Sequence, residues 1–344
     1  MKKIILLLSL ILLIISCKNK RTQIDIFPDT VKINHSKLLE GEDLVFLGGE
    51  MLYFNSDSSL IIHNPKSDSL MIKLNLGNKK ISHLIPTGNG PDEFIYINVA
   101  QKTSDSVFLF QDMNSAQLYQ MNILSGKIEK KFTYENSKCM EIVKMNNNYI
   151  ATGLFNEGMF ALWNNNSFLC YMYEYPNDNV DNKKMASKAM AYQGKMLVNE
   201  HLDRLIFCSS KFSYFELFQF DTNNVNSIKK NYAGKYEYTI SPDDNIIFAH
   251  PYENNREGYI DAYATDERIY LLYSGRSIED VNVTTHEKAC LSNQIIVYDW
   301  DGNPVIRYET DVDLKKICVN NADNTIYAIS YNPDTDIVFF KLQN

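Results

Sequence analysis

A short pattern of strand, turn and strand recurs along this chain, and it constrains the fold more than any other feature. Apolar strands such as SVFLF and RIYLLY alternate with turns that contain Gly, Asp, Asn or Pro. Copies of the pattern occur at residues 50–76, 106–133, 139–175, 189–228, 268–310 and 324–342. Short strands bounded by such turns indicate an all-β fold. Six units of about 35 to 55 residues match the repeat length of β-propeller blades.

We therefore predict a six-bladed β-propeller of four-stranded blades over residues 30–344. A single blade leaves exposed edges, whereas blades stacked around an axis bury both faces. The last unit offers three strands, ICVN, TIYAISY and DIVFFKL, so residues 30–35 (TVKINH) are expected to complete it from the N-terminus. A β-sandwich or two smaller all-β domains is the alternative, although no Pro/Gly/Ser-rich linker separates two halves. No later segment has a helical period long enough to predict a helix, and residues 189–194 are assigned to a strand.

The first 16 residues have the pattern of an export signal. Lys2 and Lys3 form a positive start, and residues 4–15 are apolar with one exception. A membrane-spanning helix needs about 20 apolar residues, so this run has the length of a signal-peptide core instead. The order IISC at residues 14–17 resembles a lipobox, in which an acyl-glyceryl group is attached through the cysteine sulfur before cleavage. We predict a removed signal peptide at residues 1–16, lipid on Cys17 and a tether at residues 17–29; an uncleaved anchor helix is the alternative.

Lipid on Cys17 makes a membrane the first expected partner. Two or more acyl chains anchor a protein stably, because each buried methylene contributes about 0.8 kcal/mol. Residues 18–22 (KNKRT) are basic, so the acidic cluster that directs some lipoproteins to the cell surface is missing. We expect a lipid-anchored protein of the cell envelope, held in the outer membrane and facing the periplasm.

Charge and cysteine spacing exclude several classes of site. Removal of residues 1–16 takes away Lys2 and Lys3 but no acid, so the formal net charge moves from −8 to −10. Such an acidic domain lacks the basic surface that phosphate backbones require, which excludes nucleic acid as a partner. The five cysteines after Cys17 form no C-x-x-C pair, so a zinc knuckle or redox motif is not expected. We interpret them as small buried hydrophobes, although their odd number leaves one free or paired with another chain.

The segment GNGPDEF at residues 88–94 is the sharpest local motif. Gly88 and Gly90 can take a positive φ, and Pro91 fixes the chain just before Asp92 and Glu93. It is not a phosphate cradle, because no lysine follows and no helix opens after it. We interpret it as a structural corner between strands in which Glu93 caps backbone amides; contact with a ligand is the alternative.

Two polar loops are candidate binding surfaces, because long loops on a rigid scaffold often carry function. In residues 250–259 the candidate ligand-binding side chains are Tyr252, Glu253, Arg256 and Tyr259. Arg can pair with a carboxylate through two hydrogen bonds, and Tyr offers a rigid, flat contact surface. Residues 276–288 (RSIEDVNVTTHEK) form the second loop. Both loops can also be solvated connections without a ligand.

Three stretches resemble the TolB-like six-bladed propeller lipoproteins of Gram-negative anaerobes. They are TGNGPDEFI at residues 87–95, YIDAYATDERIYLLYSGR at residues 259–276 and IIVYDWDGNPV at residues 295–305. The resemblance extends over most of the chain after the signal peptide. It implies a propeller fold and an envelope location, but it supplies no catalytic residues.

These observations favour a binding or scaffolding module whose partner is a protein, a peptide or a glycan. We predict no catalytic residues, no metal and no cofactor, since neither a nucleophile elbow nor closely spaced histidines occur. A metal-dependent hydrolase with its site at the propeller axis is the alternative, because axial ligands would come from different blades. Its candidate ligands are His201, Asp243, Asp244, His250 and Glu253.

Overall fold

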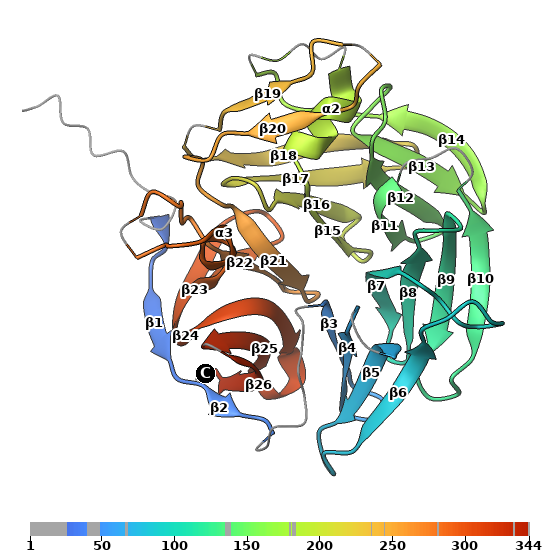
Figure 1. Cartoon of the computed structure of the whole chain (residues 1–344), viewed down its shortest axis with the longest axis vertical. Coiled ribbons are helices and arrows are strands. Elements are labelled where there is room, and N and C mark those ends of the chain that lie inside the picture. Colours follow the sequence, from blue (N-terminus) through green and yellow to red (C-terminus); the bar gives the residue numbers. More distant parts are fainter. Residues whose placement is uncertain are drawn as a thin grey trace, which may run out of the picture.

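The computed structural model shows six four-stranded blades arranged around a central axis (Figure 1). It describes residues 26–39, 49–65, 68–134, 139–178, 180, 184–234, 236–243, 245–280, 282–332 and 334–342. The predicted all-β, six-bladed propeller is therefore confirmed, and the sandwich alternative is excluded. Cys17 and the predicted signal peptide at residues 1–16 lie outside the described residues. Within the described residues, no helix is both long and apolar enough to span a membrane.

Each of the first four blades is an antiparallel meander whose first strand lies nearest the axis (Figure 1). Blade one contains β3 (Met51–Phe54), β4 (Ser59–His63), β5 (Ser69–Asn75) and β6 (Ile81–Pro86). Blade two contains β7 (Ile97–Ser104), β8 (Val107–Asp112), β9 (Gln117–Asn122) and β10 (Ile128–Thr133). Blade three contains β11 (Cys139–Met145), β12 (Asn148–Gly153), β13 (Phe160–Asn164) and β14 (Ser167–Met172). Blade four contains β15 (Gly194–Asn199), β16 (Arg204–Ser209), β17 (Tyr214–Asp221) and β18 (Asn224–Tyr232).

The last two blades share one long strand. Blade five contains β21 (Tyr259–Ala264), β22 (Arg268–Tyr273), β23 (Ser292–Asp299) and the first part of β24 (Pro304–Asn320). The second part of β24 is the inner strand of blade six, followed by β25 (Thr325–Asn332) and β26 (Asp334–Lys341). The change of partner is visible in the register, where Glu309 pairs with β23 and Cys318 pairs with β25.

The N-terminal segment closes the ring, as predicted, but different residues form the closing strand. The fourth strand of blade six is β2 (Ser36–Lys37), which pairs antiparallel with β26. Residues 30–35 were expected in that position, but residues 30–33 form β1 (Thr30–Ile33), which runs parallel to β24 on the outer edge of blade five (Figure 1). The reason is burial, because Ile33 is only 7% exposed and packs into the apolar cluster between blades five and six.

Apolar side chains fill the spaces between neighbouring blades. Phe160 of blade three meets Phe218 of blade four edge to face, with ring centroids 5.4 Å apart. Tyr53 of blade one stacks on Tyr327 of blade six at 5.8 Å, across the point where the ring closes. Such aromatic pairs contribute about 0.5–1.5 kcal/mol beyond their buried area. The contact between the first and last blades therefore resembles the contacts within the ring.

An insertion beside blade four contains the helix that the sequence pattern missed. Residues 189–191 belong to α2 (Met185–Ala191) rather than to a strand, because the run MASKAMA is rich in strong helix formers. Lys188 of this helix is fully buried and pairs with Asp178 at 2.8 Å. The hairpin of β19 (Tyr238–Ile240) and β20 (Ala249–Pro251) packs on α2 outside the ring (Figure 1). Two shorter helical segments, α3 (His286–Ala289) and η3 (Asn321–Asp323), lie in blades five and six.

The GNGPDEF segment forms the corner that leads from blade one to blade two. The Glu93 carboxylate accepts a hydrogen bond from the Gly90 amide at 2.8 Å. Gly88 provides space rather than a positive φ, because a Cβ at this position would collide with the Glu93 carboxylate and displace it. The positive φ falls on Asp92, at 63°.

Candidate functional site

A funnel of about 590 Å³ opens at one end of the axis, where the inner strands finish. Its rim consists of residues at or just beyond the ends of these strands, including Asn55 after β3, Ser104 on β7, Thr265 after β21 and Asn321 after β24. The volume lies within the range of about 300–1,000 Å³ that is usual for ligand pockets. Because strands from all six blades contribute, the funnel belongs to the ring and not to one loop.

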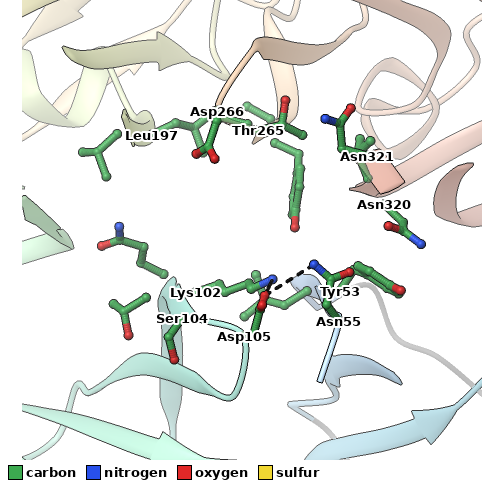
Figure 2. A pocket seen from close by; sticks show the side chains of 18 of the residues that line it. Tyr53, Asn55, Lys102, Ser104, Asp105, Leu197, Thr265, Asp266, Asn320 and Asn321 are labelled. Atoms are coloured by element: carbon green, nitrogen blue, oxygen red, sulfur yellow. Dashed lines mark hydrogen bonds and ion pairs between the residues drawn. The ribbon is translucent and has the colours of Figure 1, made fainter. Parts of the chain in front are cut away.

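Polar side chains surround the mouth of the funnel (Figure 2). Lys102 pairs with Asp105 at 3.2 Å, and Asn55 donates a longer hydrogen bond of 3.4 Å to the same carboxylate. On the opposite side, the Asp266 carboxylate faces the opening from the turn after β21 (Figure 2). Lys102 and Asp105 neutralise each other, so the blade-five side of the rim, with Asp266 and Glu267, is acidic.

The wall below the rim is apolar. It includes Leu52, Val143, Leu197 and Val319, which come from four different inner strands. Tyr53 and Tyr263 add aromatic surface to the same wall. We call these six residues the throat of the funnel.

An ion cluster closes the base of the throat. Lys195 of β15 lies 2.5 Å from Glu50 and 2.8 Å from Asp261 of β21. Lys316 of β24 lies 2.5 Å from Glu50 and 3.7 Å from Asp261. Asp261 also accepts a hydrogen bond from the Ile317 amide at 2.8 Å, and its side chain is 1% exposed. We call Glu50, Lys195, Asp261 and Lys316 the axial cluster; it joins four blades.

The charges of the axial cluster stabilise each other. Burial would raise the pKa of Glu50, but Lys195 and Lys316 outweigh it and hold this pKa far below its usual value. Burial would likewise lower the pKa of Lys195, but Asp261 and Glu50 raise it. Glu50 and the two lysines therefore stay charged near neutral pH. With Asp261 the cluster contains two carboxylates and two ammonium groups, so its formal charges cancel.

Glu141 of β11 lies beside this cluster and behaves differently. Burial raises its pKa to about 8, and the nearby Lys195 and the Met196 amide offset this only in part. Its carboxyl group accepts one hydrogen bond, from the Met196 amide at 2.7 Å, and the residue is 8% exposed. At neutral pH Glu141 is consequently protonated, so the base of the funnel carries no net charge.

A second hollow, of about 620 Å³, lies between blade four and its insertion. Five tyrosines line it, namely Tyr192, Tyr232, Tyr236, Tyr238 and Tyr252. The tyrosine hydroxyls at positions 192 and 238 both donate to Asp178, at 3.0 and 2.6 Å. Asp178 is also the partner of buried Lys188, so the carboxylate that organises this hollow is already neutralised.

The structure separates the four residues predicted from the loop at 250–259. Tyr252 is 43% exposed and lines the tyrosine hollow, and Glu253 is exposed in the turn that follows β20. Arg256 makes two hydrogen bonds of 2.9 Å to Asp280 and one of 2.7 Å to the Gly275 carbonyl, so it fastens its loop to residues 276–288. Tyr259 is 1% exposed and packs against Phe215 and Tyr273, which corrects its assignment to ligand binding.

The residues considered for an axial metal do not meet at the axis. His201 lies in the turn between β15 and β16, whereas Asp243, His250 and Glu253 lie in or next to the β19–β20 hairpin outside the ring (Figure 1). Asp244 lies outside the described residues. Glu50 and Asp261, which do lie at the axis, are paired with two ammonium groups that a cation would have to displace.

Sequence reasoning missed the axial cluster and the funnel rim. The signal that could have revealed the cluster is a charged residue near the start of a largely apolar inner strand. It occurs in MEIVKM, GKMLVN, YIDAYA and LKKICVN. The rim residues follow these strands and look like ordinary turn residues.

Comparison with known proteins agrees with this architecture. A family model described as TolB-like 6-blade propeller-like matches residues 39–322. The crystal structure of a DUF4221 family member from Bacteroides vulgatus ATCC 8482 is similar, with a TM-score of 0.58, 14% identity and coverage of 91% of this chain and 96% of that chain. A protein of Bacteroides fragilis NCTC 9343 that is described as exported has a TM-score of 0.53, 9% identity and coverage of 92% and 100%. At these identities the likeness concerns the fold alone. No curated protein matches the sequence.

Proposed function

The chain belongs to the TolB-like six-blade propeller family, and we propose that it is a lipid-anchored binding module of the cell envelope whose axial funnel receives a peptide segment of a partner. The observation that carries this proposal is the layered lining of the funnel. A polar rim stands above an apolar throat, and the throat ends on a cluster without net charge.

The throat favours a peptide over a glycan. A sugar hydroxyl placed among Leu52, Leu197 and Val319 would lose its hydrogen bonds to water, which costs about 1–3 kcal/mol for each unsatisfied group. An apolar side chain of a peptide gains free energy in the same place. The amides and carboxylates of the rim would then pair with the peptide backbone, and the acidic side at Asp266 and Glu267 favours a segment with a positive charge.

The anchor rests on sequence. The order of residues 14–17 and the apolar run before it support lipid on Cys17. Cys17→Ala should abolish incorporation of a labelled fatty acid and release the protein from the membrane fraction. Cys170→Ser is the matched control, and continued labelling of the Cys17→Ala protein would contradict the anchor.

The funnel is tested by selection from a random peptide library with the full chain purified in detergent. Leu197→Trp should fill the throat and remove binding of the selected peptides in a fluorescence anisotropy assay. Ile228→Trp is the matched control, because Ile228 is 43% exposed on the outer strand of the same blade. Thermal melts verify that both variants are folded.

Two results would overturn the proposal, one for its site and one for its ligand class. One is unchanged peptide binding by folded Leu197→Trp, which would place the peptide elsewhere. The other is binding to an oligosaccharide array, with loss in Leu197→Trp, when the peptide selection yields nothing. That result would keep the funnel as the site but make the ligand a glycan.

A further inference from the structure

Three potential metal ligands meet where the two loops around blade five touch. His286 begins α3 and Cys290 directly follows it, so the two side chains stand four positions apart on one side of a helical turn. The turn is held by Thr285, whose hydroxyl accepts a hydrogen bond from the Lys288 amide at 3.3 Å. Glu257 approaches from the segment before β21, where its backbone bonds to Arg276 and Gly275 at 2.9 and 3.0 Å.

The distances suit a single ion. His286 Nε2 lies 3.2 Å from a Glu257 carboxylate oxygen, and Cys290 Sγ lies 3.6 Å from His286 Nδ1. One ligand atom from each of the three residues lies within 4.8 Å of the others. Zinc bonds of about 2.0–2.3 Å to oxygen, nitrogen and sulfur place neighbouring ligand atoms about 3.3–3.6 Å apart in a tetrahedral site. The two short contacts use different nitrogens of the ring, so binding of one ion requires the His286 side chain to turn until a single nitrogen faces both partners.

Two of the three ligands are more buried than the third. The Glu257 side chain is 14% exposed and Cys290 is half-buried, so both are held by their surroundings. The His286 side chain is 68% exposed, so its ring has space to turn on the solvent side, and solvent can supply water as a fourth ligand. Within the part of the chain that the structure describes, this is the one group of three His, Cys, Asp or Glu side chains that converges in this way.

We propose that Glu257, His286 and Cys290 bind a transition-metal ion, with Zn²⁺ as the best match. Carboxylate, imidazole and thiolate are the three ligand types that zinc takes in proteins, whereas Ca²⁺ and Mg²⁺ take oxygen ligands. Bound zinc would join the segment before β21 to the loop at 276–290. The charged groups that face the cluster are Lys211, Glu287 and the three ligands themselves. Among these groups, Lys211 is the cation that would compete with the metal ion for the Glu257 carboxylate.

The test is titration of the full chain in detergent with Zn²⁺ alone, followed by calorimetry and thermal melting. We expect one ion per chain and a higher melting temperature. Cys290→Ser and His286→Ala should each weaken binding by roughly 100-fold or more, because loss of an outer partner of a ligand already costs about 10- to 100-fold. Cys170→Ser and His83→Ala are the matched controls, and both should bind like the unchanged protein.

Co²⁺ supplies a second measurement that reports the thiolate directly. The Co²⁺-loaded protein should show a sulfur-to-cobalt charge-transfer absorption band, and this band should vanish in Cys290→Ser but not in Cys170→Ser. Lack of stoichiometric Zn²⁺ binding would overturn the proposal. A charge-transfer band that survives in Cys290→Ser would overturn it as well, because the sulfur would then come from elsewhere.

Discussion

Replacement of Glu141 by Gln should stabilise this protein increasingly as the pH rises. Glu141 is buried beside the axial cluster, and its carboxyl group accepts one hydrogen bond from the Met196 amide. The amide oxygen of Gln can accept the same bond at nearly the same volume. The substitution therefore removes the titration of the group and leaves the packing unchanged.

The magnitude follows from the pKa. Burial raises the pKa of Glu141 from 4.5 to about 8 in the folded protein. Between these two values the unfolded chain has lost a proton that the folded chain keeps, so a rise in pH favours unfolding. Each pH unit in this window costs about 1.4 kcal/mol of folding stability, for a total of about 5 kcal/mol. Below pH 4.5 and above pH 8 both states bind the same number of protons, and the contribution is constant.

The assay is urea unfolding of both proteins at a series of pH values from about 4 to 9. The free energy of unfolding of Glu141→Gln minus that of the unchanged protein should be flat at the acid end. It should then rise by about 1.4 kcal/mol per pH unit and level off near pH 8. Glu253→Gln removes an exposed carboxylate and should run parallel to the unchanged protein. Parallel curves for Glu141→Gln would refute the argument, because the carboxyl group would then titrate alike in both states.

Three further changes test the described contacts. Deletion of residues 26–37 removes β1 and β2 and should lower the free energy of unfolding by about 3 kcal/mol or more. Burial of one Ile side chain alone contributes about 2 kcal/mol. An unchanged melting curve would show that the segment is only a tether. Glu93→Ala removes the acceptor for the Gly90 amide and should lower the free energy of unfolding, measured in urea, by about 1 kcal/mol. If Glu93→Gln lowers it equally, the loss comes from the charge and not from the hydrogen bond. Arg256→Ala breaks the exposed pair with Asp280 and should lower the free energy of unfolding by less than about 1 kcal/mol. Peptide binding to the funnel should not change. Loss of that binding would show that Arg256 contributes to the binding surface.

The fold could be predicted because its causes are local. Each blade is made of short apolar strands and tight turns, and these follow one another directly in the sequence. The errors fell where distant parts of the chain decide the structure. Residues 30–33 have the pattern of a strand, but the strand pairs with β24 because Ile33 is buried between blades five and six. Residues 189–191 lie in a short helix whose buried Lys188 depends on Asp178 in a separate segment.

The loop at 250–259 shows why a list of reactive side chains is a weak guide to a site. Arg256 has the chemistry to bind a carboxylate, and in the structure it does so, but the carboxylate is Asp280 of the same chain. Tyr259 stands at the first position of an inner strand, so its ring is buried between blades. Composition could identify these groups, but only the contacts decide whether a ligand can reach them.

The axial cluster was hidden for a reason that belongs to propellers in general. Three successive inner strands carry a charge near their start: Glu141 is third in β11, Lys195 second in β15 and Asp261 third in β21. An isolated charge in a strand usually indicates a solvent-facing position, because successive side chains point to opposite faces. In a closed ring such a charge can instead face the axis. Ring closure brings Lys195 and Asp261, which are 66 residues apart in the sequence, to within 2.8 Å of each other. Charges that recur near the start of successive inner strands therefore indicate the axis, and the turns that end those strands indicate the mouth of the funnel.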